Sequence, residues 1–108
     1  HALILPGAKV DGTAFLTGGA TVGRDVTIGP GARIDGSVIF DGAVVGAGAS
    51  VTGSIVGAGA EIGANAVLVD AVVGDGALIG ERCELLSGIR IWPGVVLPAA
   101  GIRFSAEG

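Results

Sequence analysis

One spacing runs through almost the whole chain: a Val, Ile or Leu recurs at intervals of six residues, shortened to five at three places. The series comprises Ile4, Val10, Leu16, Val22, Ile28, Ile34, Ile39, Val45, Val51, Val56, Ile62, Leu68, Val73, Ile79, Leu85, Ile91 and Leu97. Six residues rotate an α-helix by about 600°, so a helix cannot hold this series on one face. The spacing therefore predicts short strands in a repeating architecture.

The residue two positions before each of these large residues is usually small. It is Ala at most positions, and the others are Ser37, Ser54, Cys83, Val26, Ile89 and Val95. Residues two apart in a strand face the same side. Each repeat therefore has a small residue facing inward, a variable residue facing outward and a large residue facing inward. This pattern predicts that Cys83 lies in a small interior slot as an inert thiol. A lone cysteine cannot form an internal disulfide, which fits a reducing compartment.

The short step recurs after every third strand. Circuits of 17 residues run from 22 to 39, from 39 to 56 and from 56 to 73, and the last, from 73 to 91, has 18. Three strands per circuit predict an all-β, single-stranded parallel β-helix, a triangular prism of nearly six coils over residues 1–97. Residues 98–108 are expected to form a C-terminal capping tail, in which Ile102 and Phe104 cover the open strand edge.

Glycine occupies 22 of the 108 positions and directly follows the large inward residue at many predicted corners. The positions are Gly23, Gly29, Gly46, Gly57, Gly63, Gly74 and Gly80. We expect glycine there to permit positive φ at a sharp turn. The Gly-x-Gly strings at 46–48 and 57–59 are then prism corners rather than phosphate-binding loops.

Charge and hydropathy exclude several classes of partner. The chain has six basic and ten acidic residues, a net charge of −4, so it has no electrostatic footprint for nucleic acid or an anionic membrane. Residues 42–60 are uncharged but keep the repeat spacing, which does not fit a membrane span. No signal peptide is visible, and we expect a cytoplasmic protein. The chain does not begin with Met, which suggests a processed chain or an excised fragment.

Residues for catalysis are hard to find. The single histidine is His1. The carboxylates of Asp25, Asp41, Asp70 and Asp75 fall in predicted turns, whereas Glu61 and Glu84 point outward on different sides of the prism. No aligned carboxylate pair is available for acid–base chemistry. We therefore predict no catalytic, cofactor-binding or metal-binding residue in this chain.

The outer surface holds the candidate interaction residues. Val38, Ile55 and Val72 are outward residues on the same side of successive coils, and a contiguous apolar ladder on a flat face is typical of a contact surface. We expect it to mediate formation of a homo-oligomer. Phe40 and Trp92 stand where one row of corners usually has Gly, so they are candidates for docking another domain or shielding the core edge.

The repeat resembles the hexapeptide-repeat family, whose prisms are left-handed parallel β-helices, and the resemblance implies a left-handed coil. Acyltransferases of this family use a histidine as general base, and its carbonic anhydrases use three zinc-binding histidines, which this chain lacks. Several segments also resemble the C-terminal domain of bacterial mannose-1-phosphate guanylyltransferases (GDP-mannose pyrophosphorylases). They are Val22-Gly23-Arg24, Ile28-Gly29-Pro30-Gly31-Ala32, the stretch 83–88, Ile91-Trp92-Pro93-Gly94 and the tail 101–105.

In that family, an N-terminal domain joins GTP and mannose 1-phosphate with Mg²⁺, and the β-helix serves assembly or regulation. Nothing in this chain corresponds to the catalytic domain, since it has neither a Gly-rich nucleotide loop with a following basic residue nor an acidic metal pair. The resemblance therefore implies a noncatalytic C-terminal domain that binds no cofactor itself and whose partners are its own copies and the catalytic domain. The alternative is a stand-alone scaffolding β-helix without an enzymatic parent.

Overall fold

The computed structural model describes residues 2–99 and 103–105, and these residues form eighteen short strands and no helix. Sheet A contains β1 (Leu3–Ile4), β4 (Thr21–Val22), β7 (Val38–Ile39), β10 (Ile55–Val56), β13 (Val72–Val73) and β16 (Arg90–Ile91). Sheet B contains β2 (Lys9–Val10), β5 (Thr27–Ile28), β8 (Val44–Val45), β11 (Glu61–Ile62), β14 (Leu78–Ile79) and β17 (Val96–Leu97). Sheet C contains β3 (Phe15–Thr17), β6 (Arg33–Asp35), β9 (Ser50–Thr52), β12 (Val67–Val69), β15 (Glu84–Leu86) and β18 (Arg103–Ser105).

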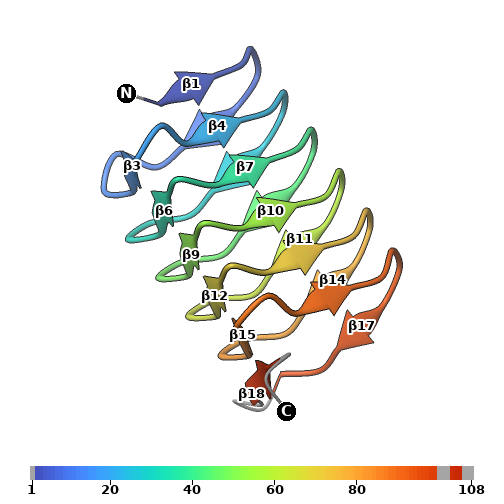
Figure 1. Cartoon of the computed structure of the whole chain (residues 1–108). Coiled ribbons are helices and arrows are strands. Elements are labelled where there is room, and N and C mark those ends of the chain that lie inside the picture. Colours follow the sequence, from blue (N-terminus) through green and yellow to red (C-terminus); the bar gives the residue numbers. More distant parts are fainter. Residues whose placement is uncertain (1, 100–102, 106–108) are drawn as a thin grey trace.

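Successive strands enter different sheets, and the chain returns to the same sheet after three strands. All the strand pairs are parallel, and the register places Val38 beside Ile55 and Ile55 beside Val72. Figure 1 shows the resulting coils stacked along one axis, with β1 at one end of the stack and β18 at the other. The molecule measures 36 × 22 × 20 Å along its principal axes. The predicted three-sided parallel β-helix of nearly six coils is confirmed.

The core consists of columns of aliphatic side chains that run along the axis. Ile28, Val45, Ile62 and Ile79 occupy one column, because their strands pair in register in sheet B, and all four are buried. The small inward residues beside them are buried as well, including Cys83. Each fully buried branched side chain contributes roughly 1.5–3 kcal/mol, so the columns stabilise the fold without large aromatic residues.

Glycine has two different roles at the corners of the prism. The expectation that glycine directly after the large inward residue has positive φ was wrong. Positive φ occurs two positions later, as at Gly31 (φ 70°) and Gly48 (φ 69°). The stretch Gly29-Pro30-Gly31-Ala32 shows why: the Ala32 N–H donates to the Gly29 carbonyl (3.3 Å), and Pro then Gly are the central residues that a type II turn favours.

Glycine directly after the large residue is instead required by the next coil. A Cβ on Gly46 would lie 2.6 Å from the backbone nitrogen of Ala64, and one on Gly63 would lie 2.6 Å from the backbone nitrogen of Glu81. Both distances are far below an ordinary contact. Glycine at these positions therefore permits the close stacking of one corner on another.

Ser37 and Ser54 are buried where the neighbouring coils have Ala or Ile. In the longer turns between sheets C and A, the inward residue donates its N–H within the turn, as Ala20 does to the Thr17 carbonyl (3.2 Å). In the shorter turns the acceptor of this N–H is a serine hydroxyl of the preceding coil instead of a carbonyl of the same turn. Ser54 N–H donates to Ser37 Oγ, and Ala71 N–H donates to Ser54 Oγ, both at 3.0 Å. The two serines thus compensate for the missing turn residue.

The last strand continues the solenoid beyond the boundary expected at residue 97. β18 pairs in parallel with β15, with Phe104 opposite Leu85, and Phe104 packs half-buried against the core. Residues 103–105 are therefore the sixth strand of sheet C. Ile102, the other residue expected to cover this end, lies outside the described residues.

Candidate functional site

The apolar ladder on sheet A has the predicted geometry. Val38, Ile55 and Val72 pair directly in register and point away from the core, at the strand spacing of about 4.8 Å. Ile55 is 42% exposed and Val72 36%, whereas Val38 is partly covered. Thr21 and Arg90 flank the three residues on the adjacent strands β4 and β16. The ladder is thus a short apolar strip bordered by polar side chains.

The two corner aromatics lie apart. Phe40 and Trp92 occupy equivalent corners between sheets A and B, but Gly57 and Gly74 stand at the two coils between them. Phe40 is 49% exposed and Trp92 76% exposed. The structure therefore provides two separate aromatic corners rather than one aromatic cluster. Trp92 is followed on sheet B by exposed Val96, which pairs with Leu78.

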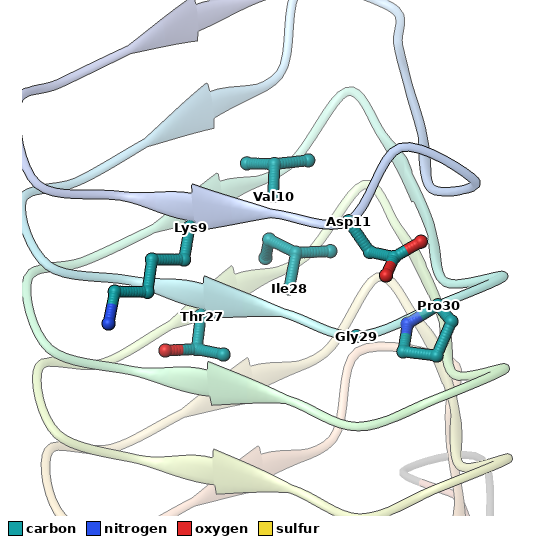
Figure 2. Close-up of a pocket in the computed structure, with 7 residues that line it drawn as sticks. All are labelled: Lys9, Val10, Asp11, Thr27, Ile28, Gly29 and Pro30. Carbon is teal, nitrogen blue, oxygen red and sulfur yellow. The ribbon is translucent and has the colours of Figure 1, made fainter.

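Two shallow hollows mark the N-terminal half of the surface. The first, of about 350 Å³, lies over sheet B and its corner to sheet C. Figure 2 shows Lys9 and Thr27 on adjacent coils, with Asp11 at the corner that follows β2 and Pro30 at the corresponding corner of the next coil.

Asp11 in this hollow has a structural role. Its carboxylate accepts hydrogen bonds from the Thr13 hydroxyl (2.6 Å) and the Thr13 N–H (2.9 Å), which hold the pKa of Asp11 below its usual range. The stabilisation is therefore present above the ordinary carboxyl pKa and is lost as the pH falls through the lowered one.

The second hollow, of about 320 Å³, lies on sheet C and was not predicted from the sequence. It is lined by Phe15, Thr17, Arg33, Asp35, Ser50 and Thr52, which come from β3, β6 and β9. Sheet C strands have three residues, with two outward positions each, whereas strands of sheets A and B have two residues. The sequence signal that could have located this hollow is the pair of outward positions flanking Leu16, Ile34 and Val51.

The carboxylates of the described residues do not gather into a metal site. Within residues 2–99 and 103–105, no group of three or more His, Cys, Asp or Glu side chains is placed to hold a metal ion. Two turn aspartates instead accept backbone N–H groups of the preceding coil: Asp41 from Arg24 (2.8 Å) and Asp75 from Ala58 (2.9 Å). Glu61 and Glu84 lie on sheets B and C, respectively, on different sides of the prism as predicted.

In the part of the chain that the structure describes, no helix is long and apolar enough to cross a membrane. The uncharged stretch at 42–60 instead forms strands β8, β9 and β10 and the corners beside them.

Comparison with solved structures supports the fold. The acetyltransferase domain of PglB from Neisseria gonorrhoeae matches with a TM-score of 0.63 and 19% identity, over 85% of this chain and 54% of that one. A hexapeptide transferase family protein from Anaplasma phagocytophilum matches with a TM-score of 0.57 and 22% identity, over 94% of this chain and 74% of that one. The fold is therefore the left-handed parallel β-helix of hexapeptide-repeat proteins.

A third structure, GDP-perosamine N-acetyl transferase from Caulobacter crescentus, matches with a TM-score of 0.60 and 25% identity, over 91% of this chain and 53% of that one. Closer in sequence is a mannose-1-phosphate guanylyltransferase of Mycobacterium tuberculosis, 66% identical over 105 residues. The match covers 97% of this chain but only 29% of that relative. A family model described as the GMPPB C-terminal domain matches residues 1–106, and the chain therefore belongs to this family of C-terminal domains.

Proposed function

We propose that this chain is the noncatalytic C-terminal domain of a mannose-1-phosphate guanylyltransferase and that it holds copies of that enzyme together. The proposal is supported by the family match and by the 66% identity to the mycobacterial relative. The transfer of a guanylyl group would then belong to the part of the protein outside this chain. The resemblance to that enzyme family implies that Mg²⁺ would act there too.

Assembly is supported by one observation above all, the apolar ladder of Val38, Ile55 and Val72 on sheet A. Burying such a strip against a second copy removes apolar surface from water, and a two-fold arrangement uses the same strip on both subunits. The polar neighbours Thr21 and Arg90 would lie at the rim of that contact.

The test replaces Ile55 with Lys and measures the mass of the protein by size exclusion with light scattering. We expect Ile55→Lys to shift the mass toward the monomer, because a buried ammonium group opposite its own symmetry mate is unfavourable. Val44→Lys on sheet B is the control: Val44, like Ile55, is an outward β-branched residue on a two-residue strand, although it is partly covered where Ile55 is 42% exposed. An unchanged mass for Ile55→Lys, or an equal shift for Val44→Lys, would contradict the assignment.

The catalytic domain is the second proposed partner, and Phe40 or Trp92 is the proposed contact. Trp92 is 76% exposed, and large aromatic side chains often anchor interfaces.

Nucleotide-sugar synthesis and the single buried cysteine support a cytoplasmic location. The alternative, a scaffolding β-helix without an enzymatic parent, predicts that the natural protein lacks turnover of GTP and mannose 1-phosphate.

A further inference from the structure

We infer that the sheet C hollow is a binding site for a small neutral sugar of hexose size. The hollow is lined by Phe15, Thr17, Arg33, Asp35, Ser50 and Thr52. Its volume of about 320 Å³ lies at the lower end of the usual range for small-molecule sites, roughly 300–1,000 Å³. This inference goes beyond assembly and does not depend on which enzyme the chain belongs to.

The hollow arises from two parallel rows of outward side chains. Phe15, Arg33 and Ser50 form one row, and the strand register sets Thr17, Asp35 and Thr52 beside each other in the second. Within one strand the two rows are about 6.6 Å apart, twice the rise per residue. The backbone of the strands lies between them because the middle residues point into the core. Short side chains at Thr17, Ser50 and Thr52 leave the space open.

The two charged side chains keep their hydrogen-bonding capacity. In the described residues Arg33 and Asp35 take part in no ion pair, although Glu84 and Arg103, farther along the same sheet, do so at 2.8 Å. The guanidinium of Arg33 lies instead over the ring of Phe15, 5.3 Å from its centroid. This stacking holds Arg33 at the edge of the hollow with its N–H groups available as donors.

The hydroxyl groups complete a mixed lining. Where the structure describes the chain, the hydroxyls of Thr17, Ser50 and Thr52 make no hydrogen bond to protein groups, so each can donate or accept. The Asp35 carboxylate accepts from hydroxyl donors, and Arg33 donates to a hydroxyl or ring oxygen. A neutral sugar presents such alternating donors and acceptors, whereas for a free anion the attraction of Arg33 is offset by the repulsion of Asp35.

The test is a titration of the ¹⁵N-labelled chain with methyl hexopyranosides (mannoside, glucoside and galactoside), followed by backbone amide shifts. We expect saturable shifts for at least one sugar, confined to β3, β6 and β9, with a millimolar Kd. Arg33→Gln and Asp35→Asn should each weaken binding at least tenfold. Glu61→Gln on sheet B and Arg24→Gln at a corner between sheets A and B are the control variants, because both side chains are exposed and lie away from the hollow, and they should leave the Kd unchanged.

Inorganic phosphate provides the discriminating arm. If phosphate shifts the amides around Arg33 while all three sugars fail to do so, the site takes an anion and the sugar assignment is overturned. Linear, unsaturated sugar shifts, or shifts that persist in both Arg33→Gln and Asp35→Asn, overturn it as well. Arg33 and Asp35 are both exposed, so neither substitution is expected to disturb the core. A preserved amide spectrum of each variant would show that a loss of binding does not come from unfolding.

Discussion

At the corner Gly63-Ala64-Asn65, the first residue is limited by the space beside the next coil, and the third is limited by its own backbone conformation. Gly63 is stacked against the following coil, where a Cβ would lie 2.6 Å from the Glu81 nitrogen. Asn65 has the positive φ, at 60°, a conformation that asparagine tolerates better than most residues. The steric limit at the first position comes from a neighbouring coil, whereas the limit at the third comes from the residue's own backbone.

Gly63→Ala should therefore destabilise the protein although φ at Gly63 is not positive. Overpacking costs about 1–3 kcal/mol, which exceeds the gain of about 0.4–1 kcal/mol from a less flexible unfolded chain. The urea midpoint should fall at an unchanged m-value. Gly12→Ala is the control, because a Cβ on Gly12 meets nothing within 4 Å and its φ is not positive. Equal midpoints for the two variants would refute the packing explanation.

Ser54→Ala tests the hydroxyl that replaces a turn hydrogen bond. Ser54 Oγ accepts from Ala71 N–H at 3.0 Å and donates to the Thr52 carbonyl at 2.8 Å. Removing it leaves the buried Ala71 N–H without this acceptor, at a cost of about 1–3 kcal/mol in the free energy of unfolding. Ser50→Ala, an outward serine of sheet C without a side-chain hydrogen bond to protein in the described structure, should change it by less than about 0.5 kcal/mol. Urea denaturation of the two variants measures the difference.

At the scale of the element, single strands of two or three residues have no stability of their own. Each strand of a solenoid is held by the strands of the coils before and after it, and interactions are confined to neighbouring coils. The terminal strands β1, β2, β3, β16, β17 and β18 each lie at a sheet edge. The inward residue Ile4 is accordingly 48% exposed, in contrast to the buried columns of the central coils.

Phe104→Ala tests how the last strand is held. Phe104 is half-buried, so its truncation should cost about 1–2 kcal/mol, less than the roughly 3–5 kcal/mol typical of a fully buried Phe. Arg103→Ala removes only an exposed ion pair with Glu84 and should cost less than about 1 kcal/mol. Hydrogen exchange should quicken in β15 in Phe104→Ala while β6 keeps its protection. A uniform loss of protection over all coils would contradict nearest-neighbour coupling.

For the whole molecule, the fold was predictable because the same spacing of Val, Ile and Leu recurs in every coil. The inward columns, the three sheets and their register follow from the positions of Val, Ile and Leu, and the structure confirms them. The order of the outward residues on sheets A and B follows in the same way, so the ladder of Val38, Ile55 and Val72 could be located before its coordinates. Its role in self-association stays a prediction that the Ile55→Lys experiment decides.

The spacing of Val, Ile and Leu along the chain sets the number of sides, the coil length and the core, because a three-sided coil turns every member of a six-residue period with a regular shorter step toward the interior. Tertiary structure alone decided what depends on contact between coils. The separation of close stacking from positive φ at the corners, the hydroxyls of Ser37 and Ser54 bonding to the next coil, and the sheet C hollow all join residues 17 or 18 positions apart. Such contacts are set by the stacking distance of the coils, a quantity that residue spacing along the chain does not contain.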